Sequence, residues 1–284
     1  MKKVATIIVT YNGEKWIERC LDSVQSSTYP SDIFVVDNAS TDHTLSILKS
    51  YKIFDVEISE ANLGFGAANN IALDKALKLD YDLFFLINQD IYLEENTLEQ
   101  LVQFSNYQTN TGIIAPIQYN GEGNEIDHNF KQYISLSKEC DSHYETTFAN
   151  AAAWLITKDC LRKTGNFNPL FLHYGEDRNY CDRVLFHKFS IKILKGTKVL
   201  HDRLQKMSLE KYIKLSKIKL LTIFLNPNFS KSESIKFGVI NVFGMGKYFF
   251  KKHRSVSALF YFIQEYISLF RKRNFLESEK NKQK

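Results

Sequence analysis

Short apolar runs alternate with helix-like stretches through the first two hundred residues of the chain. The first run, Val4–Thr10, is continuous and rich in β-branched residues, which is typical of a strand buried on both faces. Apolar residues then recur at helical spacing at Trp16, Ile17, Cys20, Leu21 and Val24. The chain therefore begins with a predicted strand followed by a predicted helix.

The same alternation continues along the chain. Further strands are expected at Ile33–Val36, Val56–Ile58, Leu83–Ile87 and Ile113–Ala115. The helices expected between them are one that Thr41 caps, one from about Phe65 to Leu79, and one that begins near Glu94. Regular alternation of strands and helices predicts an α/β fold, with a mostly parallel sheet flanked by helices on both faces.

The pattern changes after this region. Residues 118–148 are polar and weakly patterned, so we expect a loop-rich insertion there. A helix is predicted from near Glu176 to about Lys188, followed by short strands at Ser190–Leu194 and Lys198–His201. Beyond Ser208 the pattern becomes helical and cationic, which predicts one α/β domain over residues 1–204 and a helical region over 205–284.

Charge divides the chain in the same place. Residues 1–201 carry 19 Lys/Arg and 26 Asp/Glu, whereas residues 202–284 carry 18 and 6, so the net charges are −7 and +12. The first apolar run meets Asn12 and Glu14 instead of a signal-peptide cleavage site, and no window is long and apolar enough to span a membrane. The four cysteines are scattered without a CxxC pair. These features favour a cytoplasmic protein.

Polar clusters follow four of the predicted strands. The clusters are Thr10-Tyr11-Asn12, Asp37-Asn38-Ala39-Ser40, Asn62-Leu63-Gly64 and Asn88-Gln89-Asp90. Ligands of parallel α/β sheets bind beyond the carboxyl ends of the strands, where these clusters would meet. Asp37 could accept hydrogen bonds from a base or ribose, or it could belong to a helix-capping turn. Asp90 could hold Mg²⁺ or Mn²⁺ with diphosphate oxygens, or it could belong to a polar turn.

Three further features could carry chemistry. Gly64-Phe65-Gly66 with Asn69 approximates a dinucleotide fingerprint but lacks its third glycine, so a glycine-led helix start near a substrate, or a simple helix entry, fits better. Glu176 and Asp177 follow an apolar-aromatic stretch at a helix start, where one could act as a general base or both could complement the helix dipole. His201 lies at the end of a predicted strand, where it could be a metal ligand or a structural residue.

Five segments, taken together in this order, resemble the nucleotide-sugar-dependent inverting glycosyltransferases of family 2, which have the GT-A fold. The resemblance is greatest to rhamnosyltransferase-like members that build bacterial surface polysaccharides. The segments are Thr6–Asn12, Val35–Asp42, Asn62–Phe65 with Asn69, Asn88–Asp90, and Tyr174–Asp177 with Cys181 and Arg183. The resemblance implies a nucleotide-sugar half over residues 1–117 and an acceptor half over residues 118–204.

The resemblance also implies a role for each site residue. The nucleotide sugar, with UDP or dTDP as its carrier, would bind at Thr10, Tyr11, Asn12, Asp37, Asn38, Asn62, Gly64, Asn69, Asn88 and Gln89. Asp90 would hold Mn²⁺ or Mg²⁺ on the diphosphate, and His201 would reach the same metal. Asp177, with Glu176 beside it, would be the general base toward a hydroxyl of a glycan or lipid-linked acceptor.

The chain departs from the family pattern at several positions. Asn88 replaces the first acid of the metal motif, Asn168 and Asn179 stand where acids are frequent, and Asn150 stands where glycine is expected. No QxxRW motif is present, which argues against a processive synthase. A catalytically silent homologue that binds nucleotide sugar as a partner subunit is the alternative. A nucleotidyltransferase is disfavoured because no glycine-rich basic loop follows the first strand.

The last eighty residues mix aromatic and cationic side chains. Phe243, Tyr248, Phe249 and Phe250 alternate with Lys247, Lys251, Lys252 and Arg254. Such helical stretches suit peripheral contact with the anionic inner face of the plasma membrane. A helical cap on the core or a homodimer interface remains the alternative, and nucleic-acid binding is not expected because no recognition module accompanies the charge.

Overall fold

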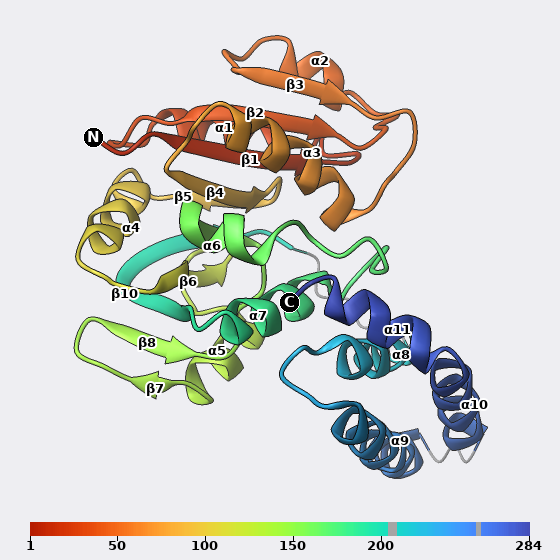
Figure 1. Ribbon diagram of the computed structural model, residues 1–284. Helices are drawn as coiled ribbons and strands as arrows, with labels where there is room; N and C mark the ends of the chain where they lie inside the picture. The colour runs from red at the N-terminus through yellow and green to blue at the C-terminus, as the bar shows by residue number, and fades with distance from the viewer. Residues whose placement is uncertain (204–208, 254–256) are drawn as a thin grey trace.

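The structure of the 284-residue protein, a computed structural model, describes residues 1–203, 209–253 and 257–284. The predicted domain boundary at residues 204–205, the helical onset at Ser208 and the side chain of Arg254 lie outside this part of the chain. Figure 1 shows an α/β body and a cluster of helices from the C-terminal region beside it.

Within the described residues, ten strands form one sheet in the order β3-β2-β1-β4-β9-β6-β10-β8-β7, with β5 beside β10. The strands are β1 Val4–Thr10, β2 Asp32–Asp37, β3 Asp55–Ile58, β4 Leu83–Asn88, β5 Ile91–Leu93, β6 Thr111–Asn120, β7 Lys138–Glu139, β8 His143–Thr146, β9 Ala153–Thr157 and β10 Ser190–His201. Strands β3, β2, β1 and β4 are parallel, and β9 is antiparallel to both β4 and β6. The predicted mixed, mostly parallel sheet is confirmed.

Helices cover both faces of this sheet, as expected (Figure 1). One face carries α1 Ile17–Gln25, α2 Thr44–Leu48 and α4 Thr97–Asn106, and the other carries α3 Phe65–Lys78, α5 His128–Ser135, α6 Lys158–Thr164 and α7 Glu176–Phe186. The inner face of α3 is made of the small residues Ala68, Ala72 and Ala76, all buried. Their size allows the helix to pack closely against β1 and β2.

The C-terminal helices are α8 Leu209–Leu225, α9 Lys231–His253, α10 Ser257–Arg271 and α11 Arg273–Asn281. They share a core in which Leu220, Phe249 and Phe262 are buried. A second cluster joins Phe224 of α8 to Phe171 of the α/β body, so the helices are packed against that body. Among the described helices, none combines the length and apolarity needed to cross a membrane.

Several boundaries differ from the sequence predictions. The two short strands expected around Leu194 and Lys198 are one strand, β10, which a bulge interrupts at Gly196 (φ +77°), a backbone conformation that glycine adopts readily. Helix α2 begins at Thr44, and Asp42 Oδ1 accepts its backbone N–H at 3.0 Å, so Thr41 is not the cap.

Other elements were missed because they are short or irregular. Strand β5 separates β4 from α4, which therefore begins at Thr97 instead of near Glu94. The region 118–148, expected to be loop-rich, contains α5 and the β7–β8 hairpin. Strand β9 and helix α6, which follow it, were not predicted.

Candidate active site

Three of the predicted polar clusters meet at the carboxyl ends of β1, β2 and β4. The backbone N–H of Asn38 donates to the Thr10 carbonyl at 2.7 Å. The side-chain oxygen of Gln89 accepts hydrogen bonds from the Thr10 hydroxyl at 2.7 Å and the Tyr11 N–H at 2.9 Å, and its Nε2 donates back to the Tyr11 carbonyl. The loops are therefore tied together by their own polar groups.

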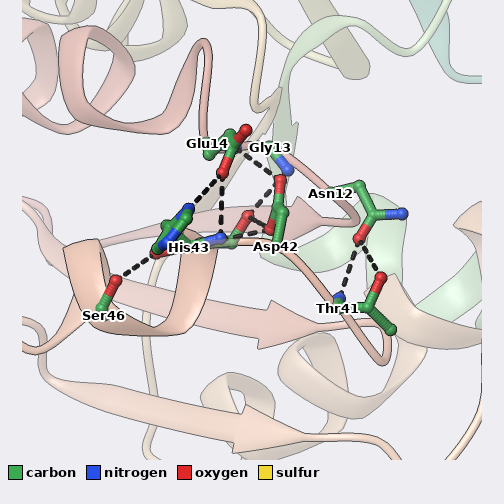
Figure 2. Close-up of polar contacts among 8 residues, drawn as sticks. Asn12, Gly13, Glu14, Thr41, Asp42, His43 and Ser46 are labelled. Atoms are coloured by element: carbon green, nitrogen blue, oxygen red, sulfur yellow. Dashed lines mark hydrogen bonds and ion pairs between the residues drawn. The ribbon is translucent and has the colours of Figure 1, made fainter.

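The loop after β1 is also fastened to the loop after β2, as Figure 2 shows. Asn12 Oδ1 accepts the Thr41 N–H at 2.8 Å, and Glu14 Oε2 accepts the His43 N–H at 3.0 Å. The N–H of Glu14 in turn donates to Asp42 Oδ2 at 3.1 Å. Asn12 thus acts as a connector between loops, and its backbone adopts a left-handed conformation (φ +46°), which asparagine tolerates.

Asp37 has the features of a ligand-binding carboxylate. The residue is fully buried, and its Oδ2 accepts the Ser40 N–H at 2.9 Å, whereas Oδ1 has no hydrogen-bond partner among the described residues. A buried polar atom without a partner is costly, so Oδ1 has the capacity to accept a hydrogen bond from a ligand or from water. Tyr11, in the adjoining loop, is 45 % exposed and available to contact a base.

The third loop joins the donor side to the segment that precedes α7. Asn38 Nδ2 donates to Asn62 Oδ1 at 2.9 Å, and Asn62 Oδ1 also accepts the Gly64 N–H at 2.9 Å. At Gly64 the backbone has φ +83°, and a Cβ there would lie 2.0 Å from the carbonyl oxygen of Leu172. Only glycine permits this approach.

Asn69 is placed differently from the other predicted donor residues. Its side chain is buried, and its Nδ2 donates to the Phe65 carbonyl of its own helix at 2.9 Å. In the described part of the chain, no hydrogen bond joins the Asn69 side chain to the strand-end loops. Gly66, one turn earlier on α3, instead faces the acid pair, because a Cβ there would lie 3.6 Å from Glu176 Cβ.

Asp90 and His201, to which the resemblance assigns one metal, lie close together. Asp90 Oδ2 is 3.6 Å from His201 Nε2, and the backbones are linked by the Asp202 N–H, which donates to the Asp90 carbonyl at 2.9 Å. His201 Nδ1 faces Gln118 Oε1 at 3.2 Å. Because an amide oxygen can only accept, this contact uses an N–H at Nδ1 and leaves Nε2 facing the Asp90 carboxylate.

These donors suit a divalent cation that the substrate helps to hold. The Asp90 side chain is 20 % exposed and therefore open to a ligand. Among the described residues, no group of three or more His, Cys, Asp or Glu side chains is arranged so that it could hold a metal ion by itself. A cation at this position would thus take two ligands from the chain and the rest from phosphate oxygens and water, which is common for Mg²⁺ and Mn²⁺ sites.

The acid pair opens α7 behind an unusual backbone turn. Tyr174 (φ +69°) and Gly175 (φ +88°) are both left-handed, and this reversal carries the chain into the helix. Burial, followed by the charge of Asp177, raises the pKa of Glu176 to about 7. Burial likewise raises the pKa of Asp177 to about 6, although the N–H groups of Arg178 and Ala151 oppose the shift. A carboxylate with such a pKa can take a proton near neutral pH.

Strand β9 brings the acid pair and the Asp90–His201 pair to the same edge of the sheet. Its antiparallel direction places residues 151–152 beside the carboxyl end of β4. There the Ala152 carbonyl accepts the Asn88 N–H at 2.9 Å, while the Ala151 N–H contacts the Asp177 carboxylate. Asp90 and Asp177 therefore project from neighbouring segments of one edge.

Sequence reasoning missed several residues around this edge. Gln118 orients His201, and Arg203 Nε pairs with the buried Asp127 Oδ2 at 3.2 Å. Burial, followed by the charge of Asp177, raises the pKa of Tyr133 to about 12, so Tyr133 interacts with the acid pair. Gln118, Asp127 and Tyr133 belong to the region 118–148, where no motif marked them.

Comparison with known proteins identifies the family. Residues 5–164 match glycosyl transferase family 2. Poly(ribitol-phosphate) beta-N-acetylglucosaminyltransferase TarP of Staphylococcus aureus is 31 % identical over 202 residues, which cover 68 % of this chain and 61 % of TarP. TarS of the same species is 29 % identical over 131 residues, covering 43 % of this chain but only 22 % of TarS.

Solved structures show the same fold. A structure of residues 1–349 of TarS with UDP-GlcNAc aligns with a TM-score of 0.65 at 20 % identity, covering 99 % of this chain and 88 % of that one. A mannosyltransferase from Pyrobaculum calidifontis, solved with GDP-Man and Mn²⁺, aligns with a TM-score of 0.59 at 13 % identity, covering 99 % and 74 %. Both alignments are to GT-A proteins. The sheet, the strand-end site and the family match lead to one conclusion: this chain belongs to glycosyl transferase family 2 and has the GT-A fold.

Proposed function

We propose that the protein is a metal-dependent, inverting glycosyltransferase that moves a sugar from a nucleotide-sugar donor to a hydroxyl of a surface-polysaccharide acceptor. The observation that supports this most directly is the placement of Asp177 on the same sheet edge as Asp90 and His201. Such an arrangement suits a donor held at one side and a base that approaches from the other.

The donor is proposed to be a UDP- or dTDP-sugar. The free oxygen of Asp37 and the exposed ring of Tyr11 suit a base and ribose, and the loops after β1, β2, β3 and β4 would hold the diphosphate and sugar. UDP-GlcNAc, the ligand of the TarS structure, supports a uridine carrier. Mannose transfer from GDP-Man is represented among the structural neighbours, so GDP-sugars belong in the test.

Asp90 and His201 would hold the proposed Mn²⁺ or Mg²⁺ ion. When bound, such an ion neutralises the negative charge that develops on the leaving diphosphate. The contribution of the chain itself is to fix the ligands in place: the carbonyl of Asp90 is anchored by Asp202, and Gln118 sets the orientation of the His201 ring.

Asp177 is proposed to take the proton from the acceptor hydroxyl, whose oxygen then attacks the anomeric carbon as the bond to the diphosphate oxygen breaks. Attack from the opposite side inverts the configuration at that carbon. Glu176 has one carboxylate oxygen without a partner among the described residues, and we assign it to the sugar or acceptor hydroxyls. Phe171, buried beside Gly175, helps to exclude water that would otherwise hydrolyse the donor.

The acceptor is proposed to be a glycan or lipid-linked glycan at the inner face of the plasma membrane. Residues 1–117 would form the donor half and 118–204 the acceptor half, because Asp127, Tyr133 and Asp177 gather on that side. The sequence match covers only 22 % of the length of TarS, so functions carried by the rest of that protein are not transferred to this one.

Turnover of donors by the full chain tests the proposal. We expect one of UDP-, dTDP- and GDP-sugars to raise the melting temperature and to be hydrolysed slowly when Mn²⁺ is present, with both effects weakened by EDTA. Asp90→Asn should lower turnover by roughly 10²-fold, as expected when charge stabilisation at a leaving group is lost. Donor binding without hydrolysis or transfer under any of these conditions would instead indicate a silent, nucleotide-sugar-binding partner subunit.

A further inference from the structure

The outward face of helix α9 combines exposed apolar and cationic side chains. Val239, Ile240, Phe243 and Phe250 are 39 %, 53 %, 59 % and 49 % exposed. Lys236, Lys247 and Lys251 are exposed as well. At 3.6 residues per turn these seven positions fall within about 120° of the helix circumference, and we call them the α9 stripe.

The opposite face of α9 is the one that packs. Val242, Met245 and Phe249 are buried against α8 and α10. Gly238 and Gly246 let α10 approach, because a Cβ at these positions would lie 2.6 Å from Tyr266 and 2.5 Å from Leu259. The structure thus divides the aromatic residues of this region: Phe249 is a core residue, whereas Phe243 and Phe250 are left in solvent.

Charge indicates what covers the stripe. No acidic residue occurs between Ser234 and His253, and in the described part of the chain no ion pair involves Lys236, Lys247 or Lys251. A second copy placed on this face would bring like charges together, which disfavours a symmetric dimer. An anionic lipid surface instead offers opposite charge to the lysines and an apolar layer to the phenylalanines.

We propose that the α9 stripe docks the protein on an anionic phospholipid bilayer, with α9 lying flat on the surface. Figure 1 shows α9 at the outer margin of the cluster of C-terminal helices, where it can meet a planar surface. The side chains of Phe243 and Phe250 enter the headgroup layer, and the three lysines contact lipid phosphates. The inference does not depend on the donor or on the base, since no residue of the sheet edge takes part.

Vesicle flotation of the full-length protein tests this proposal. We expect binding to phosphatidylcholine vesicles that contain phosphatidylglycerol, and little binding to phosphatidylcholine alone. The triple variant Lys236→Gln/Lys247→Gln/Lys251→Gln should bind about 100-fold more weakly, as expected for three cations near an anionic surface. Phe243→Ser/Phe250→Ser should lower binding by about tenfold or more.

A matched control removes the same charge elsewhere. Lys49, Lys52 and Lys78 are exposed on the α/β body, and their replacement by Gln should change vesicle binding little. Equal loss in the control and the stripe variants, or no binding of the wild-type protein, would overturn the proposal. The proposal would also be overturned if the wild-type protein were a dimer that did not bind vesicles and the Phe243→Ser/Phe250→Ser variant were a monomer.

Two further measurements distinguish a loss of vesicle binding from a loss of folding or of donor binding. Salt should weaken binding of the wild-type protein, because screening acts on the lysine–phosphate contacts, and this readout needs no variant. Donor-induced thermal shifts without vesicles should be the same for the wild type and the stripe variants. Failure of donor binding therefore affects the proposed function alone, and failure of flotation affects the α9 stripe alone.

Discussion

The donor side and the acid side of the site are built in opposite ways. On the donor side the side chains of Asn12, Asn38 and Gln89 are used to bind neighbouring loops. On the acid side, within the described residues, one oxygen of Glu176 has no hydrogen-bond partner, and backbone N–H groups together with Arg178 favour the ionised form of Asp177. The difference indicates that the donor side supplies a fixed shape, whereas the acid side supplies a group whose affinity for a proton has been raised.

The largest expected effect comes from removing the proposed base. Asp177→Asn should lower kcat by about 10²- to 10⁴-fold and leave nucleotide affinity nearly unchanged, because the donor loops do not use this carboxylate. Steady-state transfer and a nucleotide thermal shift measure the two quantities.

The control for this variant is Asp182→Asn, which removes another buried carboxylate of α7, one that pairs with Arg178 at 3.2 Å. Near-normal turnover in Asp177→Asn would refute the assignment of the base. Equal losses in both variants would instead point to a structural effect on the helix.

The next expected effect is on the stability of the folded protein, which falls when the buried Glu176 carboxyl group ionises. The pKa of Glu176 is raised from 4.5 to about 7 in the folded protein. The folded state therefore holds the proton more tightly than the unfolded state. The favourable contribution is complete below about pH 4.5 and is lost as the pH rises through about 7.

The glutamine of the Glu176→Gln variant cannot ionise, so its free energy of unfolding should not include this pH-dependent decrease. Between pH 5 and pH 8 the free energy of unfolding should fall less in the variant than in the wild type, by about 3 kcal/mol for a shift of this size. Urea unfolding at both pH values measures it, with the exposed Glu60→Gln as control. If the free energy of unfolding depended on pH in the same way in the wild type and in Glu176→Gln, burial of the ionised Glu176 carboxylate would carry no cost in stability.

The rigid donor side can be tested through its glycines. Gly64→Ala places a methyl group against the Leu172 carbonyl and should lower the free energy of unfolding by about 2 kcal/mol beyond backbone strain. Gly165→Ala is the matched control, because Gly165 also has a left-handed backbone (φ +73°) but no atom within 4 Å of an added Cβ. Equal losses at the two positions would mean that the approach of Leu172 is not required.

The smallest expected effect is the pH profile of transfer. Because burial raises the pKa of Asp177 to about 6, kcat/KM should rise with pH through this region and level off above it. At pH 5 the rate should be about tenfold below its plateau, since only the ionised carboxylate accepts a proton. The same profile in Asp182→Asn would exclude Asp182, whose pKa is also raised to about 6, as its origin.

The two sides of the site also differ in how far the sequence could predict them. The meeting of the strand-end loops was predictable because parallel strands such as β1 and β4 are continuous apolar runs that end in turn residues. Strand β9 and the short strand β5 were missed, since neither contrasts with its neighbours. The acid pair was predicted from its helix-start position, whereas its link to the donor edge through Ala151 and Ala152 depends on antiparallel pairing that no local pattern encodes.

The C-terminal region marks the other limit of sequence reasoning. Its helices were expected, but the amino-acid pattern gave Phe249 and Phe250 the same meaning. Only the packing of α9 on α8 and α10 separates the core residue from the exposed one. Likewise Asn69 resembles a donor residue by position, yet its amide is used within its own helix.

The position of α8 sets the distance between the acid pair and the α9 stripe. Ile218 of α8 lies against Gly175, directly before the acid pair, and α9 packs on the other side of α8, as Figure 1 shows. Two helix layers correspond to roughly 20 Å. With α9 on the bilayer, the reacting hydroxyl must stand clear of the headgroups by about this height. An acceptor rooted in the membrane would then need an already grown saccharide as its stalk, and a single sugar next to the lipid would be out of reach.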